Sequence, residues 1–458
     1  MKNIKTYSTY KKSEVVWLGT VPEHWEIIKS KRILVEASIK GFPDEELLAA
    51  TQTKGVVPKS VYGKTTVTAT KNFETLKLVE KGDFVISLRS FQGGIEYAHY
   101  RGIISPAYTI LKPQEEVVHK YFRYLLKSKR YISGLTLLVT GIREGQNIDT
   151  GKFKDSYLPL PSKLEQTDIA NFLDYKLEKI ARFIKKKNQL IGLLTEQKSA
   201  IINQAVTKGL NPNTKLKPSG VEWLGDIPEH WEAKRLKYIG KIINGYAFKS
   251  HWFKDKGIKV LKITNIQPMQ IVWDETSYVD EKYYEELENF RIKKNDLVFA
   301  LTRPIIKAGI KAAFIKSDEK ILINQRNAVF SLKDENTLTE WIYFVLLDKS
   351  FEKRFEKEID FTNQQPNISS KDIENIEFPI PSLIEQTKIV KHIETELSII
   401  NKTISTIEKE IELVEEYKTA LIAEAVTGKI DVRDFKIPAV ETPLTMVAEE
   451  ATNNNKTN

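Results

Sequence analysis

The chain has 458 residues, and 70 Lys and Arg against 61 Asp and Glu give it a formal net charge of +9. Hydrophobic residues make up 41% and charged residues 29%. This globular composition excludes a largely disordered or fibrous chain and leaves room for several domains of ~100–200 residues each. The absence of cysteine excludes disulfides, thiolate metal sites and cysteine nucleophiles.

The beginning of the chain, MKNIKTYSTYKKSE, has no apolar core of the kind that a signal peptide needs. The longest stretch without Asp, Glu, Lys or Arg, Tyr131–Ile142, has twelve residues, whereas a membrane span needs ~20 apolar residues. We therefore expect a cytoplasmic protein with no membrane partner. The basic charge balance is compatible with a polyanionic partner.

Three pairs of repeated blocks occur in the same order along the chain, which predicts an internal pseudo-twofold repeat. In the first pair, VVWLGTVPEHWE at Val15–Glu26 returns as VEWLGDIPEHWE at Val221–Glu232, with nine of twelve positions identical. The other pairs are PLPSKLEQT with PIPSLIEQT, at Pro159–Thr167 and Pro379–Thr387, and EQKSAIINQAVT with EYKTALIAEAVT, at Glu196–Thr207 and Glu416–Thr427.

The first block combines two Trp, a Pro and a His within twelve residues. Aromatic side chains in an irregular segment favour an arm that anchors itself in a hydrophobic seat. An acid–base role for His24 or His230 is disfavoured, because no Ser, Cys or paired carboxylate stands beside them in a catalytic pattern.

The segments between the blocks, 27–158 and 233–378, diverge in sequence but resemble each other in outline. Residues 81–90 and 294–303 each alternate as a strand does after a turn, and residues 120–128 and 340–350 each form an amphipathic helical pattern. We predict that both segments share one mixed α/β fold and differ in their surface loops.

A long helix is predicted after each PxPSxxEQ block, with Ser162 and Ser382 as N-caps and Gly209 and Gly428 as stops. Apolar residues at spacings of three and four over five heptads are typical of a coiled-coil seam. We expect the two helices to pair antiparallel, and the alternative is that each packs on its own globular half. The predicted seam residues are Leu173, Leu177, Ile180, Ile184, Ile191, Leu194, Ile393, Leu397, Ile400, Ile404, Ile407, Ile411 and Val414.

Three lysines interrupt this apolar seam: Lys187, Lys198 and Lys418. Burying a lysine is costly, so we expect these side chains either to be exposed at partner contacts or to extend their ammonium groups to the solvent.

These patterns predict an α/β (α+β) chain with five parts. They are a first mixed α/β module with its arm (1–160), a central helix (161–210), a second such module (211–380), a distal helix (381–430) and a flexible tail (431–458).

The familiar catalytic motifs are incomplete or absent in this sequence. Gly63-Lys64-Thr65 resembles the end of a phosphate-binding loop, but Pro58 stands where that motif needs glycine. The GxGxxG and HExxH motifs are absent. Pro43-Asp44 with Gln52-Thr53-Lys54 lacks the second carboxylate that would help to hold Mg²⁺. No catalytic, cofactor-binding or metal-ligating residue is predicted, which favours a binding or assembly role.

The repeated GxxPEHWE, PxPxxxEQ and AVT blocks resemble the specificity subunits of type I restriction–modification enzymes, over about residues 1–430. The resemblance implies two target recognition domains that each read one half of a bipartite site in double-stranded DNA. It implies long helices that bind two methyltransferase subunits, with restriction (translocase) subunits joining them. It also implies that the chain is not itself an enzyme and that S-adenosylmethionine, ATP and Mg²⁺ bind the partner subunits.

Lysine and arginine neutralise phosphates, and Arg, Asn and Gln read base edges. On this basis the candidate DNA-binding residues, in polar or Gly-rich stretches near strand ends, are Lys54, Lys64, Arg89, Gln92, Arg143, Gln146, Arg303, Lys307, Asn324, Gln325 and Arg326. Two alternatives remain open at this point: an assembly scaffold without DNA recognition, and a cryptic nuclease.

Overall fold

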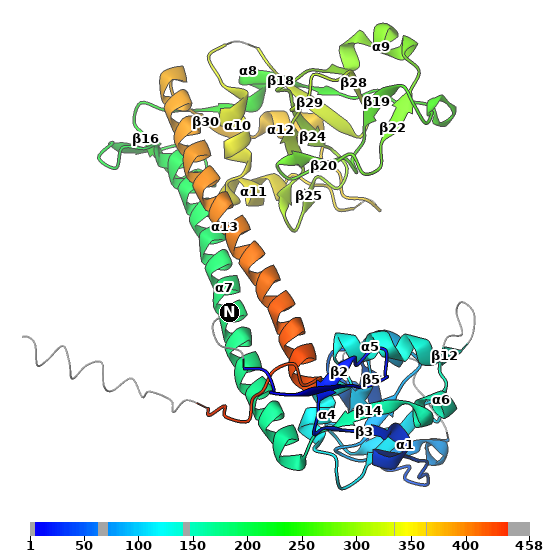
Figure 1. Ribbon diagram of the computed structural model, residues 1–458. Coiled ribbons are helices and arrows are strands. Elements are labelled where there is room, and N and C mark those ends of the chain that lie inside the picture. The colour runs from blue at the N-terminus through cyan, green and yellow to red at the C-terminus, as the bar shows by residue number, and fades with distance from the viewer. Residues whose placement is uncertain (1–4, 63–71, 141–146, 334, 363, 438–458) are drawn as a thin grey trace, which may run out of the picture. The chain divides into compact units, whose positions relative to one another are not determined.

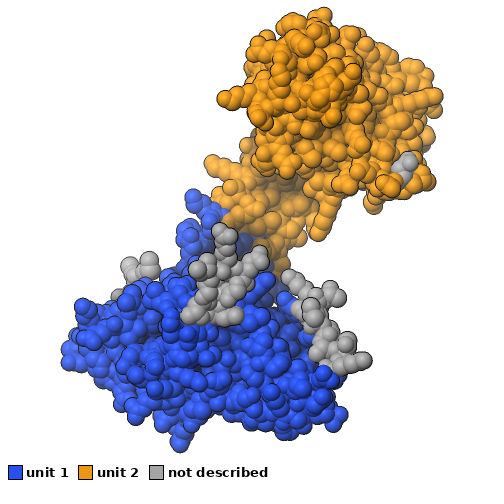
Figure 2. Space-filling model, turned by 90° about the vertical axis from the view of Figure 1, so that its right-hand side faces the viewer, with its two compact units in different colours: residues 1–187, 409–458 blue, residues 188–408 orange. Residues whose placement is uncertain are grey.

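The computed structural model describes residues 5–62, 72–140, 147–333, 335–362 and 364–437. The chain forms two compact units, residues 1–187 with 409–458 and residues 188–408 (Figure 2). Each unit thus contains one of the two divergent segments and part of both long helices (Figure 1). No helix in the described ranges has the length and apolar character needed to cross a membrane.

A four-stranded antiparallel sheet forms the centre of the first unit. Its order is β4 (Leu34–Ala37), β11 (Thr109–Pro113), β8 (Phe84–Ile86) and β9 (Glu96–Tyr97). Helices α4 (His119–Leu125) and α5 (Lys129–Leu135) contribute buried residues to the core that includes Phe84 and Leu111. Two hairpin-like pairs complete this module: β5 (Leu48–Thr51) with β6 (Gly55–Pro58), and β7 (Lys77–Val79) with β10 (Gly102–Ile104).

The second unit repeats this sheet with the same strand order. Its strands are β18 (Gly240–Asn244), β29 (Asn327–Leu332), β24 (Leu297–Ala300) and β27 (Ala312–Phe314), all antiparallel. Helices α10 (Thr339–Leu346) and α11 (Lys349–Glu356) correspond to α4 and α5. The prediction of one mixed α/β fold for both divergent segments is therefore confirmed.

The second sheet of the second unit extends an arrangement that the first unit has in smaller form, where β10 pairs with β7 and makes a parallel bridge to Leu47, just before β5. This second sheet contains β22 (Ser277–Val279), β19 (Ile258–Leu261), β28 (Ile321–Ile323) and β23 (Arg291–Ile292), with β19 and β28 parallel. A separate aromatic cluster packs against it, in which the rings of Trp252 and Tyr283 stack 4.2 Å apart. This elaboration shows that the two modules share a scaffold while they differ in their peripheral structure.

The repeated arm and block close each module in the same way. In the first, β1 (Tyr10–Lys12) pairs with β2 (Thr20–Pro22), and β3 (Glu26–Lys29) pairs with β14 (Tyr157–Leu160). The second has the corresponding pairs β15 (Leu216–Pro218) with β16 (Asp226–Pro228), and β17 (Glu232–Arg235) with β30 (Glu377–Ile380).

The two predicted long helices are α7 (Lys163–Lys208) and α13 (Leu383–Val426). Their starts are capped as expected, because the backbone N–H groups of Glu165 and Glu385 donate to the hydroxyls of Ser162 and Ser382. Gly209 and Gly428, with φ of +74° and +72°, end the helices in the left-handed conformation that glycine adopts readily.

Within each unit the two helices run antiparallel. In the first unit, Leu173 near the start of α7 shares a core with Leu421 near the end of α13, whereas Lys187 further along α7 meets Glu410 further back in α13. In the second unit, Ile202 near the end of α7 shares a core with Ile393 near the start of α13. The predicted antiparallel pairing is confirmed within each unit.

The predicted seam residues face this helix pairing, and none of them is exposed. Five are buried, namely Leu173, Ile393, Leu397, Ile400 and Ile407. The other eight are half-buried, namely Leu177, Ile180, Ile184, Ile191, Leu194, Ile404, Ile411 and Val414.

The ammonium groups of the three seam lysines make ion pairs or hydrogen bonds with polar side chains of the two long helices. Lys187 Nζ lies 2.6 Å from the Glu410 carboxylate, and Lys198 Nζ donates to Asn401 Oδ1 over 2.6 Å. Lys418 pairs within its own helix with Glu415 at 2.9 Å. These contacts account for lysine at positions where the repeat is otherwise apolar.

The segment after α13 packs against the first unit. Ile430 and Val432 are buried in its core, and the ring of Phe435 meets the ring of Phe172 edge-to-face at 4.9 Å. Because Asp431 N–H donates to the carbonyl of Lys5, the two ends of the described chain lie beside each other. Residues 438–458 of the predicted tail lie outside the described residues.

Candidate nucleic-acid interface and anchoring arm

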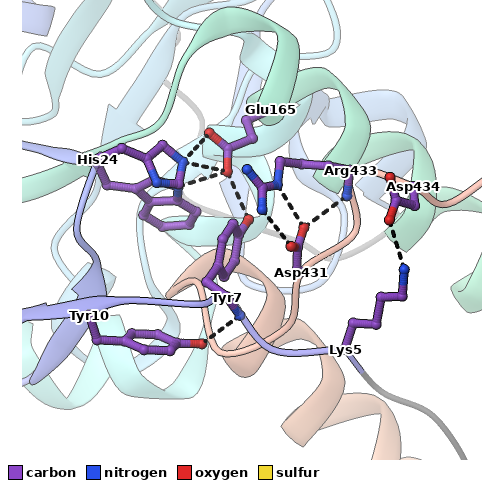
Figure 3. Close-up of polar contacts among 9 residues, drawn as sticks. Lys5, Tyr7, Tyr10, His24, Glu165, Asp431, Arg433 and Asp434 are labelled. Carbon is purple, nitrogen blue, oxygen red and sulfur yellow. Dashed lines mark hydrogen bonds and ion pairs between the residues drawn. The ribbon is translucent and has the colours of Figure 1, made fainter.

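The arm of the first copy is held by the buried carboxylate of Glu165, which is only 4% exposed (Figure 3). Tyr7 hydroxyl donates to it over 2.8 Å, Trp25 Nε1 donates over 3.0 Å, and His24 Nε2 lies 3.0 Å from it. Burial, followed by the bond to Glu165, raises the pKa of Tyr7 well above its usual value. The histidine of this block therefore serves to anchor the arm.

The segment after α13 completes this arrangement. The guanidinium of Arg433 lies 4.9 Å from the centre of the Tyr7 ring and pairs with Asp431 at 2.7 Å. The hydrogen bond from Arg433 holds the pKa of Asp431 below its usual range. Lys5 and Asp434 add an exposed ion pair at 2.8 Å between the two chain ends.

The second copy uses the same block with fewer polar contacts. His230 Nε2 lies 2.9 Å from Glu385, and Trp231 is fully buried and meets Trp341 edge-to-face at 5.6 Å. Among the described residues, the indole N–H of Trp231 is buried without a hydrogen-bond partner. The two repeated arms are therefore alike in packing and unequal in polar anchoring.

A loop face in the first module brings together segments that are distant in sequence. The turn between β5 and β6 lies against α3 (Ser90–Gly93), because a Cβ added at Gly93 would meet the Gln52 side chain at 2.8 Å. The strand β13 (Asn147–Ile148), paired with β12 (Val139–Thr140), also contacts α3. We call this set of three segments the first loop face.

Three candidate residues of the first module belong to the first loop face. Arg89 and Gln92 are exposed at α3, and Lys54 is exposed in the β5–β6 turn, where its Nζ donates to the carbonyl of Val61 over 3.2 Å. Lys64, Arg143 and Gln146 lie outside the described residues.

The second module has a matching face. Thr302 hydroxyl donates to Asn367 over 2.6 Å, and the backbone N–H of Arg303 donates to the carbonyl of Pro366 over 2.7 Å. Arg326 Nη1 donates to Gln365 Oε1 over 3.1 Å. The loop after β24 and the segment 359–368, which corresponds to 139–148, thus form the second loop face.

The other candidates of the second module lie on the loop after β24 or next to Arg326 in the turn before β29. Lys307 is exposed in the turn between β25 (Ile305–Ile306) and β26 (Gly309–Ile310). Gln325 is exposed and Asn324 is half-buried in the turn before β29. Arg303 has a φ of +48°, an unfavourable region for a residue with a side chain, and its bond to Pro366 stabilises this conformation.

Beside each face lies a lysine that the sequence patterns do not single out. Lys127 Nζ donates to the carbonyl of Gln52 over 2.9 Å and to the Glu96 carboxylate over 2.8 Å. Lys311, which is buried, donates to the carbonyl of Ile263 in the turn after β19, and burial lowers its pKa. Both lysines fasten a turn to the scaffold, and neither lies in the polar or Gly-rich stretches that guided the sequence predictions.

Glu96 is the buried acid that pairs with Lys127 beside the first loop face. Burial raises its pKa to about 7, and Lys127 opposes this shift. In the described parts of the chain, no group of three or more His, Asp or Glu is placed to hold a metal ion.

Comparison with known proteins identifies the family. The profile described as "Type I restriction modification DNA specificity domain" matches residues 22–192 and 228–413. The chain belongs to this family. Each of the two matches covers most of one module together with part of a long helix, in agreement with the repeat.

Several specificity subunits are similar to this chain over different lengths. The type I restriction enzyme MjaVIII specificity subunit of Methanocaldococcus jannaschii is 28% identical over 428 residues, which is 91% of this chain and 95% of the relative. The EcoAI specificity subunit of Escherichia coli is 32% identical over 218 residues, 47% of this chain and 36% of the relative.

Two solved structures share the fold of this specificity-domain chain. One belongs to a study of complex assembly and conformational transition of the type I restriction–modification system, with a TM-score of 0.68, 12% identity, and coverage of 90% of this chain and 99% of that one. The other is the HsdS subunit from Thermoanaerobacter tengcongensis, with a TM-score of 0.52, 13% identity, and coverage of 90% and 98%.

Proposed function

We propose that this chain is the DNA-recognition subunit of a type I restriction–modification complex, in which each module reads one half of a bipartite target in double-stranded DNA. The observation that carries this proposal is the duplicated loop face. The same segments of a common scaffold converge in both modules, while their side chains differ. Function concentrates on loops that a rigid scaffold positions, and two faces with different side chains suit two different half-sites.

The polar side chains on these faces suit nucleic acid. Arginine, lysine, glutamine and asparagine supply phosphate contacts and base-edge contacts, and the net charge of +9 favours association with a polyanion. Membership in the specificity-domain family and the relatives named specificity subunits support the same conclusion.

The assembly role follows from the repeat of the helices and arms. We expect two methyltransferase subunits for each chain, with restriction subunits joining through them, because the structures available for docking occur twice. On this proposal the chain catalyses no reaction, and S-adenosylmethionine, ATP and Mg²⁺ bind the partner subunits. Mass measurement at saturating methyltransferase should give a two-to-one complex, and a stable one-to-one complex would contradict this stoichiometry.

The DNA role is tested by binding to random duplex over a salt series. For a DNA-binding chain, the logarithm of the binding constant falls linearly with the logarithm of salt concentration, whereas a pure assembly scaffold binds little duplex at any salt. Incubation of the complex with duplex and Mg²⁺ in the absence of restriction subunits excludes the nuclease alternative if the duplex stays intact. A map of methylated adenines in cells that express the complex then gives the target, which should consist of two separated half-sites.

A further inference from the structure

Three exposed side chains of the first loop face are available for an outside partner. Gln52, Arg89 and Gln92 are exposed. Within the described residues, none of these three side chains makes a hydrogen bond to another group, in contrast to Lys54, whose ammonium is bound to Val61. Gln52 differs from the other two because both its backbone and its side chain are held in place.

The side chain of Gln52 lies directly against a glycine. A Cβ added at Gly93 would stand 2.8 Å from Gln52 Cγ and 3.1 Å from both Cδ and Nε2. Real Cβ atoms do not approach other atoms to 2.8 Å, so this position of the Gln52 carboxamide requires glycine at residue 93. Gly93 has no left-handed φ, so the backbone itself would accept alanine.

The backbone of Gln52 is fixed by its turn and by Lys127. The Thr51 hydroxyl donates to the carbonyl of Gly55 and accepts from the N–H of Lys54, both over 2.9 Å. The carbonyl of Gln52 accepts from Lys127 Nζ over 2.9 Å. Glu96, only 2% exposed, in turn holds that ammonium at 2.8 and 3.0 Å.

The backbone next to Lys127 also packs against the end of α3. A Cβ at Gly94, which follows α3, would lie 2.4 Å from the carbonyl of Leu126, the residue before Lys127. The β5–β6 turn and α3 are therefore both packed on the junction between α4 and α5. A side chain held in this way loses little rotamer freedom on binding, which is the condition for specific recognition at low entropic cost.

We propose that Gln52 reads an adenine base in the half-site of the first module, and that Gly93 and Lys127 are positioning residues for it. This proposal rests on the proposed DNA-recognition function. A carboxamide presents an acceptor and a donor side by side, and this pair matches N6 and N7 of adenine in the major groove. In the second module, Lys311 donates to the carbonyl of Ile263 in the corresponding turn, and the carboxamide of that turn, Asn265, is buried and donates to the carbonyls of Val272 and Glu275, so the two half-sites are read by different chemistry.

The test uses the full chain with its methyltransferase subunits and a pool of random-sequence duplexes whose bound fraction is sequenced. Wild-type protein should enrich a bipartite motif. Gln52→Ala should reduce the preference for adenine at one position of one half-site by about 5- to 150-fold, and the other half-site should stay unchanged. Gln52→Glu should shift that position toward cytosine, because a carboxylate accepts from cytosine N4.

Gly93→Ala separates positioning from direct contact. On its own, Gly93→Ala should weaken the base preference at the same motif position as Gln52→Ala, because the added methyl group displaces the Gln52 carboxamide. In the Gln52→Ala background it should have no further effect on the motif, since the side chain that it displaces is gone. A merely structural role of Gly93 would instead lower the thermal unfolding temperature equally in both backgrounds and leave the base preference unchanged.

Lys127→Met combined with Glu96→Gln removes the fastening of the turn without leaving an unpaired buried charge. This double variant should weaken the adenine preference at the motif position assigned to Gln52 and leave the second half-site unchanged. The matched control is Gln114→Ala, an exposed glutamine of the same module that follows the last residue of β11. The first loop face lies at the other end of this sheet, because Ile86, just before α3, pairs with Thr109 at the start of β11.

The outcomes separate this inference from the function on which it rests. If the wild-type complex enriches no motif, the proposed DNA-recognition function fails. If the wild type enriches a bipartite motif and both Gln52 variants keep it unchanged, the assignment of Gln52 is wrong. A uniform loss of affinity across all sequences with a shallower salt dependence would also overturn it, because this behaviour marks a phosphate contact.

Discussion

The indole N–H of Trp25 donates to the carboxylate of Glu165 over 3.0 Å, whereas the equivalent Trp231 leaves its indole N–H without a partner among the described residues. The side chain of Glu165 is 5% exposed and that of Glu385 is 27% exposed. Tyr7, which also donates to Glu165, has Asn213 as its counterpart 206 residues later. The two arms therefore differ in how strongly polar contacts hold them.

Glu165→Gln should lower the free energy of unfolding of the first unit by about 1–3 kcal/mol, because it replaces the carboxylate by a neutral amide and so weakens the charge-assisted hydrogen bonds from Tyr7 and Trp25. The matched variant Glu385→Gln should cost less than about 1 kcal/mol, since its partly exposed pair is screened by solvent. Urea unfolding measures the loss of unfolding free energy in both variants. Hydrogen exchange in residues 5–30 shows whether the loss caused by Glu165→Gln arises in the first arm. Equal losses would show that the extra contacts of the first arm contribute nothing.

Two adjacent isoleucines of α13 test the helix seam. Ile400 is 5% exposed in the seam, and Ile399 is 59% exposed on the outer face. Ile400→Asp should destabilise the second unit by about 3–5 kcal/mol, because it places an unpaired charge in an apolar contact. Ile399→Asp should change stability by less than about 0.5 kcal/mol, and Ile180→Asp should act on the first unit in the same direction as Ile400→Asp. If Ile400→Asp and Ile399→Asp have the same thermal unfolding temperature, the assignment of Ile400 to the helix seam is wrong.

Glu96 makes the stability of the first module depend on pH. Burial raises its pKa from 4.5 to about 7 in the folded chain, so between these values the folded state binds a proton that the unfolded state has released. The free energy of unfolding should therefore fall as pH rises from about 4.5 to about 7. Urea unfolding at pH 5 and pH 8 should show this fall in the wild type and a smaller one in Glu96→Gln. An unchanged difference between the two pH values in the variant would assign the effect to other groups.

The sequence predicts the parts of this protein that follow from periodicity and repetition. The seam from Leu173 to Val414, the caps at Ser162 and Ser382, and the stops at Gly209 and Gly428 are local patterns, so they can be derived from residue spacing alone. The shared fold of the modules follows from the matched strand and helix patterns around 81–90 and 294–303.

The loop faces could not be derived in the same way. The contact between Gln52 and Gly93, and the bond from Lys127 to the turn, join residues 41 and 75 positions apart, and no sequence period links them. The local sequence pattern predicts only that Lys127 lies near the end of an amphipathic helix. One signal was available, since Glu96 stands between the apolar residues Ile95 and Tyr97 and a buried acid requires a cationic partner.

Exchange of whole modules tests the division of recognition between the two loop faces. The sheets of the two modules have the same strand order, and β3 with β14 and β17 with β30 close them in the same way. We expect that replacing residues 27–158 by the corresponding segment of a relative changes one half of the methylated motif. The distance between the half-sites should stay the same, because α7 and α13 are retained.

Arg303→Ala makes the same test at a single residue of the second loop face. Its side chain is exposed, and the bond from its backbone to Pro366 does not depend on the guanidinium. If Arg303 contacts a base, the variant should lose about 1–3 kcal/mol of discrimination at one position of the second half-site, whereas loss of a phosphate contact would weaken all sequences evenly. The methylated motif before and after each change is the measurement, with the first half-site as internal control. A module exchange that alters both half-sites, or neither, would mean that the repeat serves assembly alone.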